Sequence, residues 1–100
     1  MIFFQGPPMK IAFEPEYTGS PLVLPEGGKI VCSSDGQPTP TYTWFCNGQQ
    51  WKVGAELYID SGLARGVDVN TCYCTAENQV DGDNFGIARY IEFYGVCSCN

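Results

Sequence analysis

The sequence predicts an all-β domain, a sandwich or barrel of seven or eight short strands. Three observations lead to this prediction. Short β-type runs alternate with turn clusters at the spacing such folds show, no segment holds a helical period for three turns, and six cysteines occur in 100 residues. An even number of cysteines in a short chain rich in turns favours a disulfide framework and an oxidising compartment.

The first half of the chain contains four β-type runs. They span residues 10–15, 21–26, 28–34 and 41–46. The letters EYTGS separate the first two runs, and the turn-rich DGQPTP separates the last two. The pair Asn47-Gly48 follows the fourth run and is a strong signal for a tight turn.

The second half contains three more runs, at residues 55–60, 70–78 and 86–96. The letters DGDN at 81–84 turn the chain between the last two. Because strand faces alternate with a period of two, Cys72 and Cys74 share one face of their run with Asn70. By the same rule Trp44 shares a face with Cys46, and Cys32 with Ile30.

The order Cys32, Trp44, Cys74 resembles that of the immunoglobulin superfamily. The stretch EGGKIVCSSDGQPTPTYTWFCNG is similar to the second and third strands of I-set and C2-type domains. LYID followed by DVNTCYCTAEN is similar to the family pattern L-x-I … D-x-G-x-Y-x-C-x-A-x-N. The resemblance covers about residues 10 to 96.

This resemblance implies an immunoglobulin-like, disulfide-stapled two-sheet sandwich with Greek-key connections. Cys32 and Cys74 would bridge the sheets beside Trp44, with Leu57 and Ile59 in the core. A dozen residues separate Trp44 from Leu57, which leaves room for one short edge strand around 49–53. The subtype expected is therefore I-set or C2-like, since a variable-type domain needs two strands there.

The chain departs from the family pattern at Cys72, where the family has the tyrosine of the tyrosine corner. We expect a covalent bond to hold this corner instead. Cys46 should lie opposite Cys72 within disulfide range. Four arrangements stay open for the remaining cysteines: 46–72 with 97–99, 46–97 with 72–99, 46–99 with 72–97, or 46–72 with Cys97 and Cys99 pairing between chains.

Other chemistry finds little support in the sequence. A zinc site is disfavoured because the Cys-x-Cys spacings are too short and histidine is absent. The absence of histidine also removes Ser-His-Asp and Cys-His catalysis. Asp81 and Asp83 suggest only a weak calcium site, since an EF-hand loop needs a longer ligand series. We therefore expect no enzyme activity, no cofactor and no metal.

Charge and hydropathy narrow the range of partners. The net charge of −6, with only five Lys and Arg residues, excludes nucleic acid as an expected partner. No apolar run approaches the length of a membrane span, so membrane insertion by this fragment is not expected. The letters FQGP resemble the remnant of an engineered protease site. Residues 1–8 are therefore expected to be vector-derived or disordered, and residues 9–100 to form one domain with a Cys-containing C-terminal tail.

A partner surface is expected on the outer face of the third and sixth strands and the last one. Aromatic residues carry much of the binding energy in interfaces. The candidates are Phe45, Tyr73, Trp51, Tyr90 and Tyr94. A second candidate is the pole formed by the loops at 33–39 and 78–85.

By resemblance, the expected function is that of a non-enzymatic recognition or adhesion module of a secreted or cell-surface protein, such as a receptor or an immune-type binder. Its partner would be a protein, homophilic or heterophilic, and carbohydrate binding has no residue pattern in its favour. The alternative is a structural spacer or disulfide-linked assembly module without a ligand. An intracellular muscle-type I-set domain is disfavoured by the cysteine count.

Overall fold

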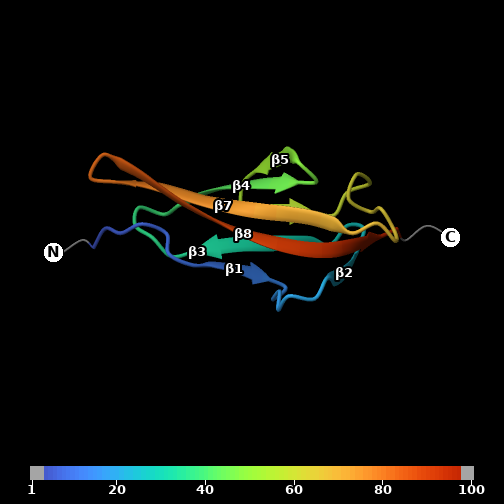
Figure 1. Cartoon of the computed structure of the whole chain (residues 1–100). Helices are drawn as coiled ribbons and strands as arrows, with labels where there is room; N and C mark the ends of the chain where they lie inside the picture. The colour runs from blue at the N-terminus through green and yellow to red at the C-terminus, as the bar shows by residue number, and fades with distance from the viewer. Residues whose placement is uncertain (1–3, 98–100) are drawn as a thin grey trace.

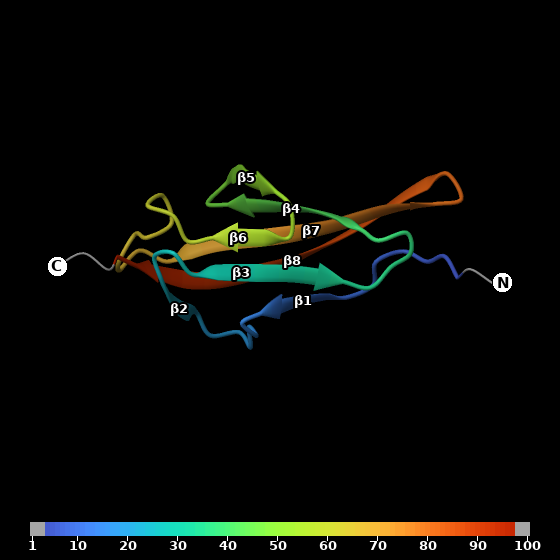
Figure 2. The ribbon, with the colours of Figure 1, turned by 180° about the vertical axis from the view of Figure 1, so that it is seen from behind.

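The computed structural model describes residues 4–97 as two β-sheets without a helix in that range (Figures 1 and 2). The smaller sheet has the order β1-β3-β6, made of β1 (Ile11–Glu14), β3 (Lys29–Ser34) and β6 (Glu56–Tyr58). The larger sheet has the order β2-β8-β7-β4-β5. Its members are β2 (Leu22–Pro25), β8 (Asp83–Val96), β7 (Asn70–Val80), β4 (Thr41–Cys46) and β5 (Gln49–Val53).

The prediction of an all-β, disulfide-linked, immunoglobulin-like sandwich is confirmed, with eight strands. The chain crosses between the sheets after β1, β2, β3, β5 and β6, whereas β4–β5 and β7–β8 are hairpins within the larger sheet. β2 runs parallel to β8, and the other strand pairs among the described residues are antiparallel. A short edge strand, β5, occupies residues 49–53.

The alternation of side chains explains why these segments become strands. β7 buries Asn70, Cys72, Cys74 and Ala76 and turns the residues between them outward. Two tight turns reverse the hairpins, and both residues of each turn have positive φ: 52° and 85° at Asn47-Gly48, 51° and 85° at Asp81-Gly82. This conformation suits Asn-Gly and Asp-Gly, because their steric cost in the left-handed region is low.

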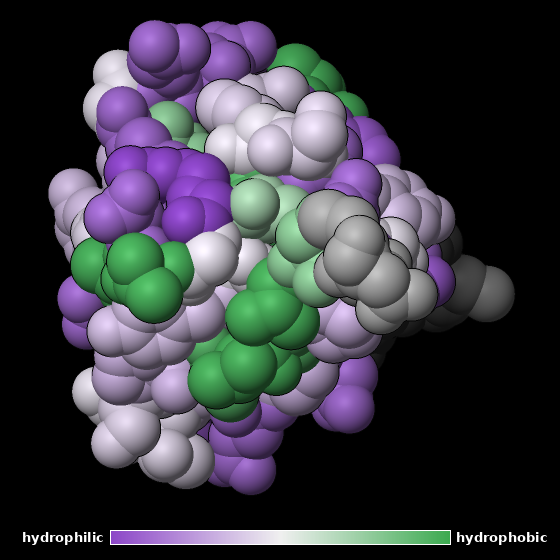
Figure 3. Space-filling view, turned by 90° about the vertical axis from the view of Figure 1, so that its right-hand side faces the viewer, coloured by the Kyte–Doolittle hydropathy of each residue, from purple (hydrophilic) through white to green (hydrophobic). Residues whose placement is uncertain are grey.

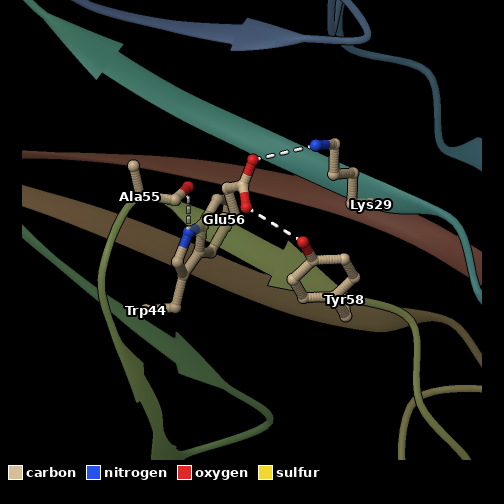
Figure 4. Close-up of polar contacts among 5 residues, drawn as sticks. All are labelled: Lys29, Trp44, Ala55, Glu56 and Tyr58. Atoms are coloured by element: carbon tan, nitrogen blue, oxygen red, sulfur yellow. Dashed lines mark hydrogen bonds and ion pairs between the residues drawn. The ribbon is translucent and has the colours of Figure 1, made fainter.

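The core is centred on Trp44 and the disulfide between Cys32 and Cys74. The two cysteine Cα atoms lie 6.6 Å apart on opposite sheets. The indole N–H of Trp44 donates to the carbonyl of Ala55 at 3.0 Å (Figure 4). The amide of Cys32 donates to the same oxygen at 2.9 Å. Trp44, Leu57 and Ile59 are fully buried in this core.

A second disulfide joins Cys46 to Cys72 within the larger sheet. These residues face each other directly in the β4–β7 register, with Cα atoms 4.1 Å apart. This pairing excludes the two arrangements in which Cys46 and Cys72 each bond to the C-terminal cysteines. Cys97 is not free either, and Cys99 lies outside the described residues.

The segment before β1 is attached to the sandwich. Gly6 forms an antiparallel bridge with Gln37 through two backbone hydrogen bonds of 3.0 Å, and Pro8 is fully buried. The amides of Met9 and Lys10 both donate to one carboxylate oxygen of Asp35, at 2.8 and 3.1 Å. The ordered structure therefore includes residues ahead of position 9.

The domain is elongated, with extents of 57 × 23 × 20 Å. The β7–β8 hairpin extends beyond the rest of the sandwich at the end where the chain begins (Figure 1). Residue 97 lies at the opposite end. The molecule thus has two different poles, one formed by the long hairpin and the 35–40 connection, the other by the 59–69 connection and the end of β8.

Candidate interaction face

Three aromatic side chains stack across three strands on the outer face of the larger sheet. Phe45 of β4 lies directly opposite Tyr73 of β7, which in turn lies opposite Tyr90 of β8. The rings of Phe45 and Tyr73 are stacked, with centroids 4.7 Å apart and an angle of 12° between planes. Tyr73 and Tyr90 are tilted at 48° with centroids 5.0 Å apart. We call Phe45, Tyr73 and Tyr90 the aromatic ladder.

The ladder is half-buried at one end and exposed at the other. Phe45 and Tyr73 are half-buried, whereas 62% of Tyr90 is exposed. Aromatic contacts of this geometry stabilise by about 0.5–1.5 kcal/mol each beyond their buried area. Each ring is therefore held by its neighbour, and Tyr90 presents most of its surface to solvent.

The surroundings of the ladder are largely uncharged. The outward positions of β4, β7 and β8 contain no Lys or Arg. Threonines flank the ladder at Thr43 and Thr75, and the Thr75 hydroxyl contacts the carbonyl of Thr43 at 3.4 Å. The carboxylates on this face are Glu77 and Glu92, and Glu92 is the next outward residue after Tyr90 on β8. An apolar, hydroxyl-rich centre with charge at its rim is typical of protein interfaces.

The other two predicted aromatics do not join the ladder. Tyr94 lies on the same face but is half-buried beside Val23 of β2, at the far end of β8. Trp51 lies on β5, as expected, but packs against the core on the other side of the sheet. An irregularity in the β4–β5 register between Trp44 and Phe45 shifts the faces of β5, and the Trp51 ring covers Gly62.

The loop pole predicted as a second candidate is held together by Asn78. Its side-chain amide donates to the carbonyls of Gly6 at 2.9 Å and Pro38 at 3.0 Å, so it joins the hairpin to two other segments. A shallow pocket of about 420 Å³ opens beside it, lined in part by Thr41, Glu77 and Asn84. The Asn78 side-chain oxygen is buried without a hydrogen-bond partner.

A different surface covers the smaller sheet. Lys29 forms an ion pair of 2.8 Å with Glu56, whose other oxygen accepts a 2.9 Å hydrogen bond from Tyr58 (Figure 4). The hydrogen bond to Glu56 raises the pKa of Lys29, and the hydrogen bonds from Lys29 and Tyr58 lower the pKa of Glu56. Lys52 places its ammonium 4.7 Å from the Tyr58 ring centre. The charged and polar groups of Lys29, Glu56 and Tyr58 are therefore already bonded to one another.

The pole where the chain ends carries apolar surface in patches of different size. Figure 3 shows one larger hydrophobic patch near the centre of this pole and smaller patches separated from it by polar side chains. Among the described residues, Val67 is the most exposed large apolar side chain, at 92%. Scattered apolar residues of this kind are normal on soluble domains. The aromatic ladder is therefore the better candidate for an interaction face.

The acidic residues do not gather into a metal site in the part of the chain that is described. No group of three or more Cys, Asp or Glu side chains there could hold a metal ion. Asp60 accepts hydrogen bonds from the amides of Gly62 and Leu63, at 2.9 and 3.1 Å, and so supports a turn. Asp81 and Asp83 lie in and beside the hairpin turn. Within residues 4–97, no helix is long and apolar enough to cross a membrane.

Two structural side chains were not identified as such from the sequence. The guanidinium of Arg89 donates to the carbonyls of Ile11 and Tyr17, both at 3.0 Å, and lies 4.9 Å from the Phe13 ring centre. Asn70 was expected to face inward, but the sequence did not indicate which hydrogen bonds its side chain forms. It is fully buried, and its amide donates to the carbonyl of Leu63 at 2.8 Å.

Comparison with known proteins gave no match to this chain, either among family models, among curated proteins or among solved structures.

Proposed function

We propose that this chain is a non-enzymatic recognition module of the immunoglobulin superfamily, of I-set or C2-like type. It binds a protein partner, either another protein or a second copy, through the aromatic ladder. The observation that carries the proposal is the exposed Tyr90 ring, packed beside Tyr73, which in turn stacks on Phe45, on a face without Lys or Arg.

The physical basis is the low entropic cost of binding to a surface that is already ordered. A tyrosine has two side-chain torsions, and here the neighbouring rings restrict them. Large, rigid, amphipathic rings supply much contact area for little lost freedom, which is why tyrosine is frequent in binding hot spots. The hydroxyls of Tyr90 and Thr75 can provide the directional hydrogen bonds that an apolar surface lacks.

The cysteine chemistry supports an extracellular site of action. Two intrachain disulfides suggest an oxidising environment, since thiols are kept reduced in the cytosol. We place the module in a secreted protein or in the ectodomain of a membrane protein. Adhesion, receptor recognition and immune-type binding are the roles that this placement and fold resemblance suggest.

The test replaces one ring of the ladder and compares it with a matched ring elsewhere. Tyr90→Ser removes the most exposed member, and Tyr58→Ser removes an exposed tyrosine from the opposite sheet. Self-association is measured by sedimentation equilibrium, and binding of the labelled domain is measured on a panel of cell surfaces. We expect Tyr90→Ser to weaken the interaction at least tenfold and Tyr58→Ser to leave it within twofold. Equal effects of the two substitutions would contradict the proposal.

A spacer role is the second candidate, and one observation favours it. The described chain starts at one end of a 57 Å long body and leaves at the other (Figure 1). This arrangement allows domains to be joined end to end. A domain that shows no self-association and binds none of the surfaces tested, with or without Tyr90, would favour the spacer over the recognition module.

A further inference from the structure

One edge of the larger sheet has no neighbour over most of its length. β8 spans Asp83–Val96, but β2 pairs with it only from Phe93 to Val96. On that side, residues 83–92 therefore form a free strand edge about ten residues long. A row of unpaired backbone N–H and C=O groups of this kind can accept another strand.

The pairing of β7 with β8 shows which residues direct their backbone groups to this edge. Val80 and Asp83 flank a two-residue turn, so they form a hydrogen-bonded pair, and such pairs then recur at every second residue. The odd-numbered residues of β8 thus bond to β7, and the even-numbered ones face the free edge. The carbonyl of Val96, an even position, accepts a 2.8 Å hydrogen bond from the amide of Glu26, the residue after β2. This contact agrees with the alternation.

The usual features that protect a strand edge are missing here. Natural edge strands carry Pro, Lys or a β-bulge. Residues 83–92 contain none of these, and the register with β7 is continuous. The side chains at Gly86 and Ala88 are small. Arg89 is an inward charge, but its guanidinium is already bonded to the carbonyls of Ile11 and Tyr17.

A groove of about 660 Å³ runs along this edge, between β8 and β1. Glu14 and Glu16 line its rim. Asp83 and Glu92 lie at the two ends of the free edge, and Glu92 accepts a 3.3 Å hydrogen bond from Tyr17. The cations nearby are Lys10 and Arg89, the second of which faces backbone carbonyls. With a chain charge of −6, two copies repel each other, whereas a positively charged segment is attracted.

We propose that the free edge of β8 takes an extended, basic segment of a partner protein by strand addition. The segment bonds to the backbone groups of Asn84, Gly86 and Ala88, and its Lys or Arg side chains face Glu14 and Glu16. Main-chain bonds supply affinity in this mode, and charge supplies selectivity. This surface adjoins the aromatic ladder at Tyr90 but binds through backbone groups instead of rings, and the Ala88 and Tyr90 substitutions test the two separately.

The probe is a blocked ten-residue peptide of alternating Lys and Val, compared with one of alternating Glu and Val. Titration is followed by amide resonances of the folded domain. We expect the basic peptide to shift and protect the amides of Asn84, Gly86 and Ala88, and the acidic peptide to leave them unchanged. Binding that is absent up to millimolar peptide, or that moves only resonances elsewhere, would overturn the proposal.

Two variants make the assignment specific. Ala88→Pro removes one N–H group that faces the free edge and leaves the backbone hydrogen bonds between β8 and β7 in place. Ala88→Ser keeps that N–H group. We expect at least a tenfold loss of affinity for the first and less than twofold for the second. Should Ala88→Pro not fold, Glu14→Gln combined with Glu16→Gln serves instead, with a severalfold loss expected. Binding that is unaffected in the folded variant used would contradict strand addition.

Discussion

The buried amide of Asn70 supplies the hydrogen bond that an immunoglobulin-like domain usually takes from a tyrosine. Cys72 occupies the position at which the family has its corner tyrosine, and it forms a disulfide bond with Cys46. Two residues earlier, Asn70 donates to Leu63 in the connection after β6, and its oxygen accepts from Asn47 at 3.0 Å and Arg65 at 3.3 Å. The corner is thus held by both a covalent bond and a small polar network.

Replacing Asn70 should therefore be costly. Asn70→Ala leaves the Leu63 carbonyl and the Asn47 amide without their partner, which we expect to destabilise the domain by about 1–3 kcal/mol. Asn47→Gly is the comparison: it removes the bonds of the exposed Asn47 side chain to Asn70 and Thr71 but keeps the buried bond to Leu63, and Gly suits the positive φ there. Its effect should be smaller. Urea unfolding measures both, and a loss below about 0.5 kcal/mol for Asn70→Ala would contradict the account.

Gly95 shows a second requirement at the same corner. A Cβ atom added there would overlap the carbonyl oxygen of Leu63 and lie 2.9 Å from the Cα of Ala64. Because backbone must move, we expect Gly95→Ala to cost about 2–3 kcal/mol. At Gly86, in the same strand, the contact is a flexible Glu77 side-chain carbon at 3.1 Å. Gly86→Ala should therefore be tolerated. Thermal unfolding measures the stability of both variants, and similar losses of stability for the two would refute the steric explanation.

At the scale of elements, one carboxylate contributes to the attachment of the residues just before β1. Hydrogen bonds from the amides of Met9 and Lys10 lower the pKa of Asp35 below its ordinary value of 3.8. A lowered folded-state pKa means that this stabilisation is present above the ordinary value and is lost as the pH falls through the lower one.

The pH titration of this contact can be observed directly. We expect the amide resonances of Met9 and Lys10 to move together with a midpoint below 3.8. Asp35→Asn should abolish this titration and leave the resonances of β7 unchanged. A midpoint at or above 3.8 in the native chain would show that the two amides do not bond to the carboxylate.

The strands were predictable because side chains alternate between the two faces of a strand, and this alternation can be counted in the local sequence. Side-chain orientation in β7 and β8, including that of the ladder residues Tyr73 and Tyr90, follows from counting. Trp51 does not, because an irregularity beside Phe45 shifts the face, and such shifts depend on the partner strand. The hydrogen bonds of Arg89 depend on segments more than 70 residues away, which no local pattern encodes.

For the molecule as a whole, the two disulfides constrain different directions. Cys32–Cys74 connects the sheets, and Cys46–Cys72 connects neighbouring strands within one sheet. The second loop lies inside the first in the sequence. Since the outer bond already restricts the unfolded chain, the inner one adds less than the roughly 3 kcal/mol that its loop alone would give.

Removal of the inner bond should leave a folded but weaker domain. We expect Cys46→Ala combined with Cys72→Ala to lose about 1–3 kcal/mol, because both positions are fully buried and the alanines fill less space. Guanidinium unfolding gives the value, and the near-ultraviolet circular dichroism of the packed aromatic residues, which include Trp44 and Trp51, serves as the control for an intact core. A variant that fails to fold at all would mean that Cys32–Cys74 alone is not sufficient.

The architecture of the two sheets could be predicted from the sequence more completely than the features of the surface. The Cys–Trp–Cys order and the turn pairs specify a sandwich, since each is a local requirement of that fold. The free edge of β8, the groove beside β1 and the contacts of the first residues arise only when distant segments meet. For that reason the unpaired edge was not predicted, while the outward placement of Phe45, Tyr73 and Tyr90 was.

The most direct test of the account is the disulfide map of the unreduced protein. Cys72 and Cys74 are separated only by Tyr73, so chymotryptic cleavage after that tyrosine is needed to separate them before mass spectrometry. The account predicts one peptide pair joining Cys32 to Cys74 and another joining Cys46 to Cys72. A map that joins Cys32 to any cysteine other than Cys74 would contradict the sandwich and the functions proposed on it.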